Sequence, residues 1–258
     1  MDTIADDKGP AGLCSDAAGN VWVTDFGAAS KQIVEYAHGG TTPIATLDDP
    51  NKEPRGCSIN PKNGDLAIAN GNPGNVVIYS HASGSPTAYT PRLSYPFSCS
   101  YDGSGNLFVD GYRLRYSAKF ALSELRSGES DFVTIGVEAM LGLPGNIQWD
   151  GTYLAVGEYP LSATIYRLDI EQRRTAATLE GTVSLGGLVP ASPRGVQFSV
   201  RGGTLVMPFG TNKRVTNVGF WQYPAGGEHF VGLHGFGGGE LYGVAISALP
   251  GSSHPVLR

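Results

Sequence analysis

Four oxygen-bearing side chains stand at comparable places in the sequence, each at the end of a run of β-forming residues: Asp25, Asn70, Asp110 and Glu158. Carboxylate and amide oxygens are the ligands that Ca²⁺ and Mg²⁺ prefer in proteins. A divalent cation held by such a ring could polarise the carbonyl group of a lactone or an ester. An Asp or Asn at a strand end also caps its own turn by accepting hydrogen bonds from backbone N–H groups. A metal site and a capping role both stay open on these residues.

Other charged and aromatic residues fall near the same positions. Arg55 and Arg194 each stand between a proline and a glycine, while Tyr112 and Arg113 lie just beyond Asp110. We therefore predict a ligand-binding face that contains these four residues together with the four oxygen-bearing side chains. The sequence has no Gly-x-Ser-x-Gly motif or comparable nucleophile arrangement. No residue is predicted to be catalytic.

A tandem repeat must position these residues. A pattern of Pro or Leu, any residue, usually Gly, then three residues and a small polar residue recurs six times. The repeats begin at Pro10, Pro54, Pro96, Pro144, Pro193 and Leu241. We call these six residues the anchors. Their spacing of 42–49 residues is that of a four-stranded propeller blade.

Each of the first five anchors leads through a turn into further β-rich runs. Gly19-Asn20 and Gly105-Asn106 are typical of tight hairpins, because Gly and Asn tolerate a positive φ. The recurring aromatic residues, such as Trp22, Phe108 and Trp221, are interpreted as packing between blades. The prediction is an all-β protein with one β-propeller domain over residues 1–258 and six expected blades, five of them complete.

The sixth blade is predicted to be incomplete and shared by the two ends of the chain. Its C-terminal part supplies an inner strand after Leu241, and residues 3–7 resemble the outer strand of the first blade. Two middle strands are missing, for which we favour a truncated start. Unpaired strand edges readily pair with strands of other chains. We therefore expect a homo-oligomer, or coverage of the open edge by residues 250–258.

Composition narrows the classes of partner. Lys and Arg number 18 against 23 Asp and Glu, so the net charge is −5, and no basic cluster offers a nucleic-acid surface. No apolar stretch is long enough to span a membrane. Residues 1–7 lack the features of a signal peptide, which indicates either a cytoplasmic protein or one whose leader has been removed. Cys14, Cys57 and Cys99 show no metal-binding spacing; they are interpreted as core residues, with a disulfide between two of them left open.

The runs Gly19–Asp25 (GNVWVTD) and Gly105–Asp110 (GNLFVD), with the Pro-x-Gly anchors, resemble NHL-repeat propellers. They are equally similar to the wider superfamily that contains SMP-30-like lactonases and streptogramin lyases. The whole pattern is closest to uncharacterised secreted bacterial propellers. The resemblance implies a six-bladed fold, an extracytoplasmic location if a leader was removed, and an acidic and amide cluster comparable to that of the lactonases. The lyases are expected to use a histidine on the ligand-binding face, and His38 and His81 instead fall on turns at the outer rim.

Three functions follow. The first is a non-catalytic propeller that binds a protein, peptide or glycan through one face. The second is a metal-dependent lactonase or esterase-like hydrolase that uses Asp25, Asn70, Asp110 and Glu158, with a Ca²⁺ or Mg²⁺ ion. The third is a structural protein that assembles through open blade edges. The first is favoured, because the repeat motifs specify architecture and carry no chemistry of their own.

Overall fold

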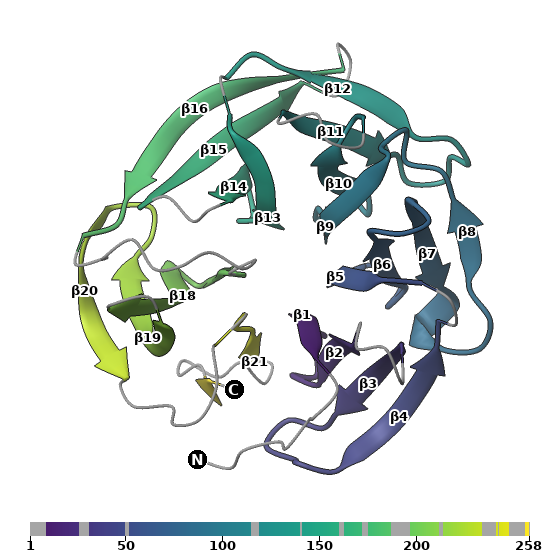
Figure 1. The fold of residues 1–258 in the computed structure, drawn as a ribbon, viewed down its shortest axis with the longest axis horizontal. Coiled ribbons are helices and arrows are strands. Elements are labelled where there is room, and N and C mark those ends of the chain that lie inside the picture. Colours follow the sequence, from purple (N-terminus) through teal and green to yellow (C-terminus); the bar gives the residue numbers. More distant parts are fainter. Residues whose placement is uncertain are drawn as a thin grey trace.

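The structure is a computed structural model that describes residues 9–25, 31–49, 52–114, 119–139, 141–159, 163–171, 175–186, 197–211, 214–233, 241, 243–247 and 256–257. These residues form an all-β ring of radially arranged sheets around a central axis (Figure 1). The only helical element described is one 3-10 turn, η1 (Ser80–Ala82). Among the described residues, no helix has the length and apolar character needed to cross a bilayer.

Five consecutive units of four antiparallel strands make up most of the described ring. Unit one contains β1 (Pro10–Ser15), β2 (Val21–Asp25), β3 (Gln32–Tyr36) and β4 (Pro43–Asp48). Unit two contains β5 (Pro54–Ile59), β6 (Leu66–Asn70), β7 (Asn75–Tyr79) and β8 (Thr87–Tyr89). Unit three contains β9 (Tyr95–Tyr101), β10 (Leu107–Tyr112), β11 (Phe120–Leu125) and β12 (Val133–Val137).

Unit four contains β13 (Leu143–Trp149), β14 (Leu154–Tyr159), β15 (Thr164–Glu171) and β16 (Ala176–Ser184). Unit five contains β17 (Ser199–Arg201), β18 (Thr204–Thr211), β19 (Arg214–Gln222) and β20 (Gly226–Leu233). The chain ends with β21 (Ile246–Ser247) and β22 (Val256–Leu257), which pair antiparallel. In each unit the first strand is innermost and the fourth lies at the rim (Figure 1).

Four of the predicted anchors coincide with innermost strands. Pro10 and Pro54 begin β1 and β5, and Pro96 and Pro144 are the second residues of β9 and β13. Pro193 lies outside the described residues, as do residues 3–7, which were predicted to form an outer strand. The second and third strands of each unit cover the predicted β-rich runs. The repeat in the sequence therefore predicted the positions of these strands correctly.

The turns between the first and second strands are capped by one side chain in each of the first four units. Asp102 Oδ1 accepts hydrogen bonds from the backbone N–H groups of Ser104 and Asn106, both at 2.8 Å. Gly105 has a φ of +84° in this turn, a conformation that favours glycine. The equivalent Asp16, Asn60 and Asp150 also accept bonds from turn backbone. Each of these side chains therefore caps its own turn.

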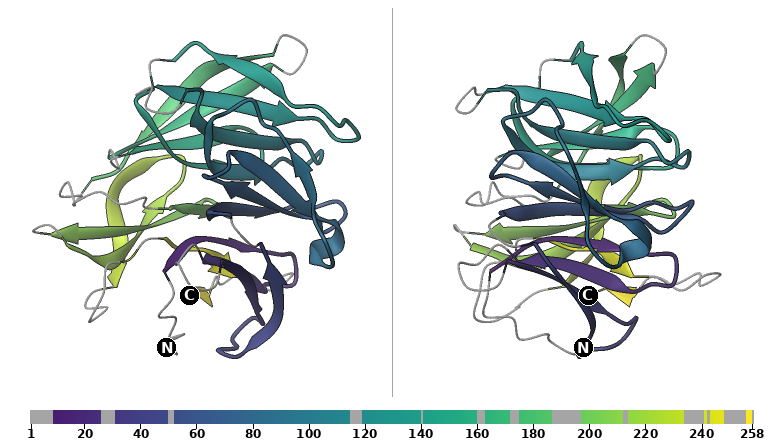
Figure 2. Two further views of the ribbon diagram at one scale, coloured as in Figure 1. Left: turned by 45° about the vertical axis from the view of Figure 1, so that its right-hand side comes forward. Right: turned by 90° about the vertical axis from the view of Figure 1, so that its right-hand side faces the viewer.

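Apolar clusters lie between consecutive sheets rather than within one. Trp22 and Ile33 of unit one pack with Cys57 and Leu66 of unit two, and clusters of the same kind join units two to three, three to four, and four to five. Figure 2 shows the sheets lying face to face around the ring. Burial of two sheet faces against each other removes apolar surface from water that a single unit would expose. The buried Trp22, Phe108 and Trp221 confirm the predicted packing role of the aromatic residues.

The segment that contains β21 fills the space between unit five and unit one. Val244 and Ile246 pack with Val206 and Val218 of unit five, and Ala245 packs with unit one, against Val23 among others. The Ile246 N–H donates to Ser199 Oγ at 3.3 Å, and Ser15 Oγ donates to the Ile246 carbonyl at 2.9 Å. The described residues therefore close the ring.

One outer-edge pairing was not predicted. Gly136 and Val137 of β12 pair in parallel with Ala176 and Ala177 of β16, so that units three and four share one eight-stranded sheet. No local pattern in the sequence of β12 or β16 indicates this contact, because pairing between outer strands depends on where the finished units lie. The sheet organisation within the described residues is thus four, four, eight, four and two strands.

Candidate functional site

Innermost strands approach one another most closely at the second residue after the anchor proline. A Cβ atom on Gly12 would lie 2.0 Å from the Arg55 carbonyl oxygen, and one on Gly56 would lie 2.7 Å from the Ser98 Cα. Both contacts are with backbone, which has no room to move aside. The glycine of the Pro-x-Gly pattern is therefore explained by the close crossing of strands near the axis.

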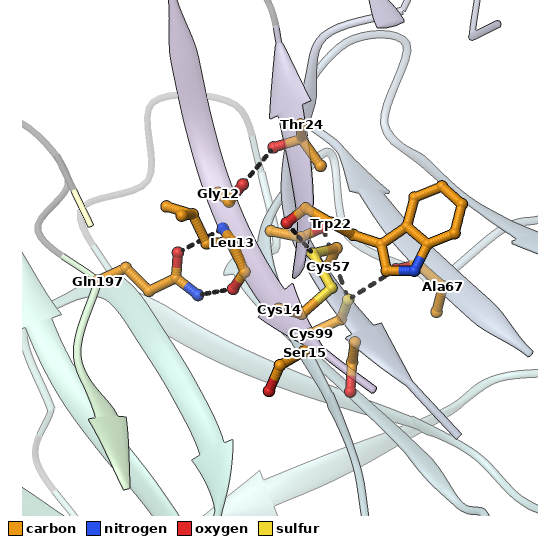
Figure 3. The surroundings of a disulfide bond; sticks show 12 residues. Gly12, Leu13, Cys14, Ser15, Trp22, Thr24, Cys57, Ala67, Cys99 and Gln197 are labelled. Carbon is orange, nitrogen blue, oxygen red and sulfur yellow. Dashed lines mark hydrogen bonds between the residues drawn. A yellow bond between two sulfur atoms is a disulfide. The ribbon is translucent and has the colours of Figure 1, made fainter. Parts of the chain in front are cut away.

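The fourth residue after the anchor ties each innermost strand to another. Ser58 Oγ and Ser100 Oγ accept backbone N–H groups of the next unit at 2.9 and 2.8 Å. The longer Gln197 reaches Leu13, whose N–H donates to Gln197 Oε1 at 2.8 Å and whose carbonyl accepts from Gln197 Nε2. Figure 3 shows this pair of bonds from the glutamine to β1. These ties hold the innermost strands in a fixed ring around the channel.

In unit one the tie is covalent. Cys14 forms a disulfide with Cys57, which joins β1 to β5 (Figure 3). The disulfide that the sequence left open is therefore formed by Cys14 and Cys57. Cys99 is a buried free thiol with Sγ 3.7 Å from the carbonyl oxygens of Gly56 and Ala67. Burial raises the pKa of Cys99 above its ordinary value, which makes its thiolate form unfavourable.

A β-bulge follows the anchor proline in each of the first four innermost strands. The pairing of β1 with β2 passes from Pro10 to Gly12 and leaves Ala11 as an extra residue. Phe97 and Gly145 are extra in the same way, and Arg55 and Gly56 lie in the corresponding interval of β5. A bulge bends the strand and re-aims a side chain. The bulges lie at one end of the central channel.

A cavity of about 500 Å³ opens at this end, and we call it the mouth cavity. Its size is within the range of about 300–1,000 Å³ that is usual for ligand pockets. The bulge residues of all four strands line it. The described residues that line it are Gly9, Pro10, Ala11, Gly12, Arg55, Gly56, Tyr95, Phe97, Ser98, Tyr112, Gly145, Asn146, Tyr159 and Gln197.

Four aromatic rings form one side of the mouth cavity. The Tyr95 and Tyr112 rings are 6.2 Å apart, and the Phe97 and Tyr159 rings are 6.3 Å apart, both pairs tilted. All four residues are half-buried, and burial raises the pKa of Tyr95 and of Tyr112. The opposite side is formed by the small residues of β1. The cavity thus has an aromatic wall and a backbone wall.

Arg55 provides the one formal charge among the lining residues that the structure describes. Its guanidinium carbon lies 5.0 Å from the Tyr95 ring centroid and 5.3 Å from that of Phe97. Glu53 Oε2 is 3.9 Å from the guanidinium and accepts a hydrogen bond from the Tyr95 hydroxyl at 3.3 Å. A guanidinium stacked in this way is held in a defined orientation.

Two carboxamides lie deeper, where the mouth cavity meets a second cavity of about 220 Å³ along the channel. Asn146 and Gln197 line both cavities. Asn146 Nδ2 donates to Ser98 Oγ at 3.1 Å, whereas its buried Oδ1 has no hydrogen-bond partner among the described groups. An amide oxygen at the wall of a cavity can accept a hydrogen bond from a ligand or a water molecule.

Three of the predicted oxygen ligands are buried beside the bulges instead of lining the cavity. Asp25 is 1% exposed, and Asn70 and Asp110 are fully buried. Asp110 Oδ1 accepts the Ser98 N–H at 2.7 Å, and Asn70 Nδ2 donates to Asn75 Oδ1 at 3.1 Å. Burial, opposed by hydrogen bonds from backbone N–H groups, raises the pKa of Asp110 to about 7. Asp110 supports the backbone that carries the mouth cavity.

Glu158 lies apart from these three. Its Oε1 accepts the Gly142 N–H and its Oε2 accepts the Tyr166 hydroxyl at 3.3 Å. In the part of the chain that the structure describes, no three His, Cys, Asp or Glu side chains come together as a metal-binding group. Within the described residues, Asp25, Asp110 and Glu158 therefore do not form such a group.

Of the other predicted residues, Arg55 and Tyr112 line the mouth cavity, as expected. Arg113 is exposed and is not part of the lining. Arg194 lies outside the described residues. The prediction missed Tyr95, Phe97 and Tyr159. Phe97 could have been found, since it holds the same place after its anchor proline as Arg55.

One histidine has a different setting from the one expected. His38 was interpreted as a solvated residue at the outer rim, but it is half-buried and its Nδ1 lies 2.6 Å from Ser247 Oγ. Ser247 is fully buried and also donates to the Gly19 carbonyl. His38 thus contacts the strand that closes the ring. His81 is exposed within η1, as predicted.

No protein-family model matches the chain, and no curated protein matches its sequence. Solved structures do match. A chain in the crystal structure of a nidogen/laminin complex has a TM-score of 0.71 and 16% identity, over 93% of this chain and 85% of that chain. A functionally unknown protein from Desulfotomaculum acetoxidans DSM 771 has a TM-score of 0.62 and 15% identity, over 90% of this chain and 74% of that one.

At these identities the likeness concerns the fold alone. The chain matched in the nidogen/laminin complex is a β-propeller. Its likeness covers nearly the whole chain, and the described strands form radial antiparallel units around an axis. The protein therefore has a β-propeller fold.

Proposed function

We propose that the protein is a non-catalytic binding propeller that holds a protein, peptide or glycan in its mouth cavity. The observation that carries the proposal is the composition of the cavity wall: four aromatic rings, one oriented guanidinium and two carboxamides. Ligand sites are usually concave and largely apolar, with a few placed polar groups. Aromatic side chains supply contact area at a small entropic cost, and the polar groups supply orientation.

The hydrolase alternative lacks a comparable observation. Its proposed ligands Asp25, Asn70 and Asp110 are engaged inside the sheets, and Glu158 bonds to Gly142 and Tyr166. A carboxylate that supports backbone is a sufficient reason for an acidic residue at these positions. The binding proposal therefore rests on Arg55 and the aromatic wall.

The architecture that accompanies this proposal is a six-bladed propeller of the NHL-like and SMP-30-like type, formed as one domain over residues 1–258. Five blades are the units described above, and the sixth includes β21 and β22. Six apolar clusters, each between neighbouring parts of the ring, support this count. Self-association through the sixth blade stays a prediction, which light scattering of the purified chain tests directly.

We also propose that the protein works in an oxidising, extracytoplasmic compartment. The Cys14–Cys57 disulfide supports this location, because disulfides persist where thiols are not kept reduced. A labelled copy of the chain expressed in its native host should fractionate outside the cytoplasm, with this bond resistant to thiol alkylation.

The binding proposal is tested by filling the cavity. Ala11→Trp places a large side chain in the mouth cavity without removing any group from its aromatic wall. Peptide and glycan arrays probed with the unmodified protein should show ligands that this variant loses. The matched control is Ala88→Trp, at an exposed position of β8 on the outer rim. Equal binding by the two variants would show that the ligand lies elsewhere.

A further inference from the structure

The four bulges place one residue of each innermost strand at the same structural position. These residues are Ala11, Arg55, Phe97 and Gly145, each the first after its anchor proline. All four line the mouth cavity, whereas the residues of the regular second strands beside them do not, Tyr112 and Tyr159 at the strand ends excepted. The anchor proline and the close-packed third residue fix the backbone on either side. The residue between them is free to differ without disturbing the strand crossing.

The side chains at this position differ sharply around the ring. Ala11 and Gly145 bring almost no side chain to the described lining of the mouth cavity. Arg55 and Phe97 are large and stack on each other, with the guanidinium carbon 5.3 Å from the Phe97 ring. Of these four described positions, two therefore leave room and two provide a charge beside a flat apolar surface.

We propose that the residue after the anchor proline is the specificity-determining position of the mouth cavity, and that Arg55 there selects a ligand with an oxyanion attached to a flat apolar body. This inference rests on the proposed binding function. A guanidinium recognises carboxylate, sulfonate and phosphate groups through its planar set of N–H donors. The rings of Phe97 and Tyr95 offer the flat surface beside it.

The surroundings of Arg55 keep its guanidinium in place without a ligand. Gly71 packs directly against it: a Cβ atom there would lie 2.7 Å from the Tyr95 ring and 2.8 Å from Arg55 Nε. Glu53 contacts the guanidinium at 3.9 Å, a long separation for an ion pair, and is not part of the cavity lining. The Arg55 side chain is 25% exposed. A preorganised cation loses little conformational entropy when an anion binds.

Two fluorescent probes with the same aromatic scaffold test the Arg55 charge separately from the flat apolar surface. 8-Anilinonaphthalene-1-sulfonate carries an oxyanion, and N-phenyl-1-naphthylamine is its neutral counterpart. The unmodified protein should bind the sulfonate at least about ten times more tightly than the neutral probe, which corresponds to about 1.4 kcal/mol. Arg55→Gln should remove that preference and leave the affinity for the neutral probe unchanged. Phe97→Ala should weaken both probes.

The matched control is Arg113→Gln, which removes a cation that is exposed and outside the cavity lining. It should leave both affinities unchanged, and thermal melting should show that each variant is folded. Sulfonate binding that survives Arg55→Gln, or that falls equally with Arg113→Gln, would overturn the inference while the binding function stands. If Ala11→Trp blocks neither the probes nor the array ligands, the proposed function fails as well.

Discussion

Neighbouring parts of the ring are held together differently at two joints: the contact between units one and two, and the closing contact of β21 with units five and one. Between units one and two, the Cys14–Cys57 disulfide crosses the innermost strands, and Thr24 Oγ1 donates to the Arg55 carbonyl at 2.5 Å. Where the ring closes, β21 has two residues and is held by Ser15, Ser199 and Ser247. The first joint is covalent and broad, and the second consists of a narrow strand with small polar contacts.

The difference indicates where the ring should open. Hydrogen bonds to backbone contribute about 1 kcal/mol each, whereas a disulfide removes conformational freedom from the whole unfolded chain. Local opening draws on the parts with the fewest buried contacts. We therefore expect the closing joint to open on its own, and the joint between units one and two to break only when the ring unfolds. The predictions below test this ranking.

The largest effect is expected from Gly12→Ala. The new methyl group would lie 2.0 Å from the Arg55 carbonyl, so β1 and β5 could not keep their crossing. The free energy of unfolding should fall by more than about 3 kcal/mol. The melting temperature should drop by about 10 °C. Gly103→Ala is the matched control, since nothing lies within 4 Å of its Cβ position. Equal melting temperatures for the two variants would contradict the close crossing.

Two isoleucines allow the joints to be compared by the same substitution. Ile68, in the cluster between units one and two, is fully buried, and Ile246 at the closing joint is 2% exposed. Ile68→Ala should cost about 3–5 kcal/mol of global stability. Ile246→Ala should cost about half as much in urea unfolding. Hydrogen exchange should show faster opening of β21 in that variant, with β6 unaffected; equal protection of the two strands would refute the ranking.

Removal of the disulfide should reduce the difference between the two joints in the free energy needed to open them. The double variant Cys14→Ser, Cys57→Ser should lose about 2–4 kcal/mol of unfolding free energy, because the cross-linked residues are 43 positions apart. A reductant should lower the stability of the unmodified protein by the same amount and leave that of the variant unchanged. An unmodified protein that is indifferent to reductant would contradict the role given to this bond.

A smaller, pH-dependent effect concerns the joint between units three and four. The pKa of Asp110 is raised to about 7 in the folded protein, so the folded state holds its proton over a range in which the unfolded state has lost it. The resulting stability is complete below about pH 4 and is lost as the pH rises through 7. Over that range the unmodified protein should lose stability relative to Asp110→Asn, by about 1.4 kcal/mol for each pH unit between the unfolded and the folded pKa.

Asp150→Asn provides a control of opposite sign. Hydrogen bonds from backbone groups, Tyr223 and Arg167, which outweigh the effect of burial, lower the pKa of Asp150. Its contribution is therefore present above the ordinary pKa of an aspartate and is lost as the pH falls through the folded value. Urea unfolding should show Asp110→Asn diverging from the unmodified protein between about pH 4 and 8, and Asp150→Asn diverging in the opposite direction below about pH 4. Parallel curves would contradict both assignments.

The anchors, the turn caps and the second strands could be predicted from the sequence, because a blade imposes the same local requirement at each repeat. Gly105 and Asp102 illustrate this: the turn needs a positive φ and an acceptor for its N–H groups. The burial of Asp110 could not be predicted in this way. Whether a strand-end carboxylate faces the channel or the neighbouring sheet depends on the bulge, which only the pairing of two strands reveals.

The candidate site was predicted in part for the same reason. Arg55 and Tyr112 were found by their types, whereas Tyr95, Phe97 and Tyr159 were interpreted as ordinary strand residues or passed over. The parallel pairing of β12 with β16 and the contact of His38 with Ser247 join segments far apart in sequence. No local pattern specifies such contacts, because they depend on the radius and closure of the whole ring.

The position of the disulfide along the chain has a consequence for synthesis. Cys14 and Cys57 both precede unit three, so their bond can form on a nascent chain before the later units have been translated. Domains and repeats generally fold as they emerge. A cross-linked pair of units would then serve as a template on which the following units add in order, until β21 meets β1 and completes the circle.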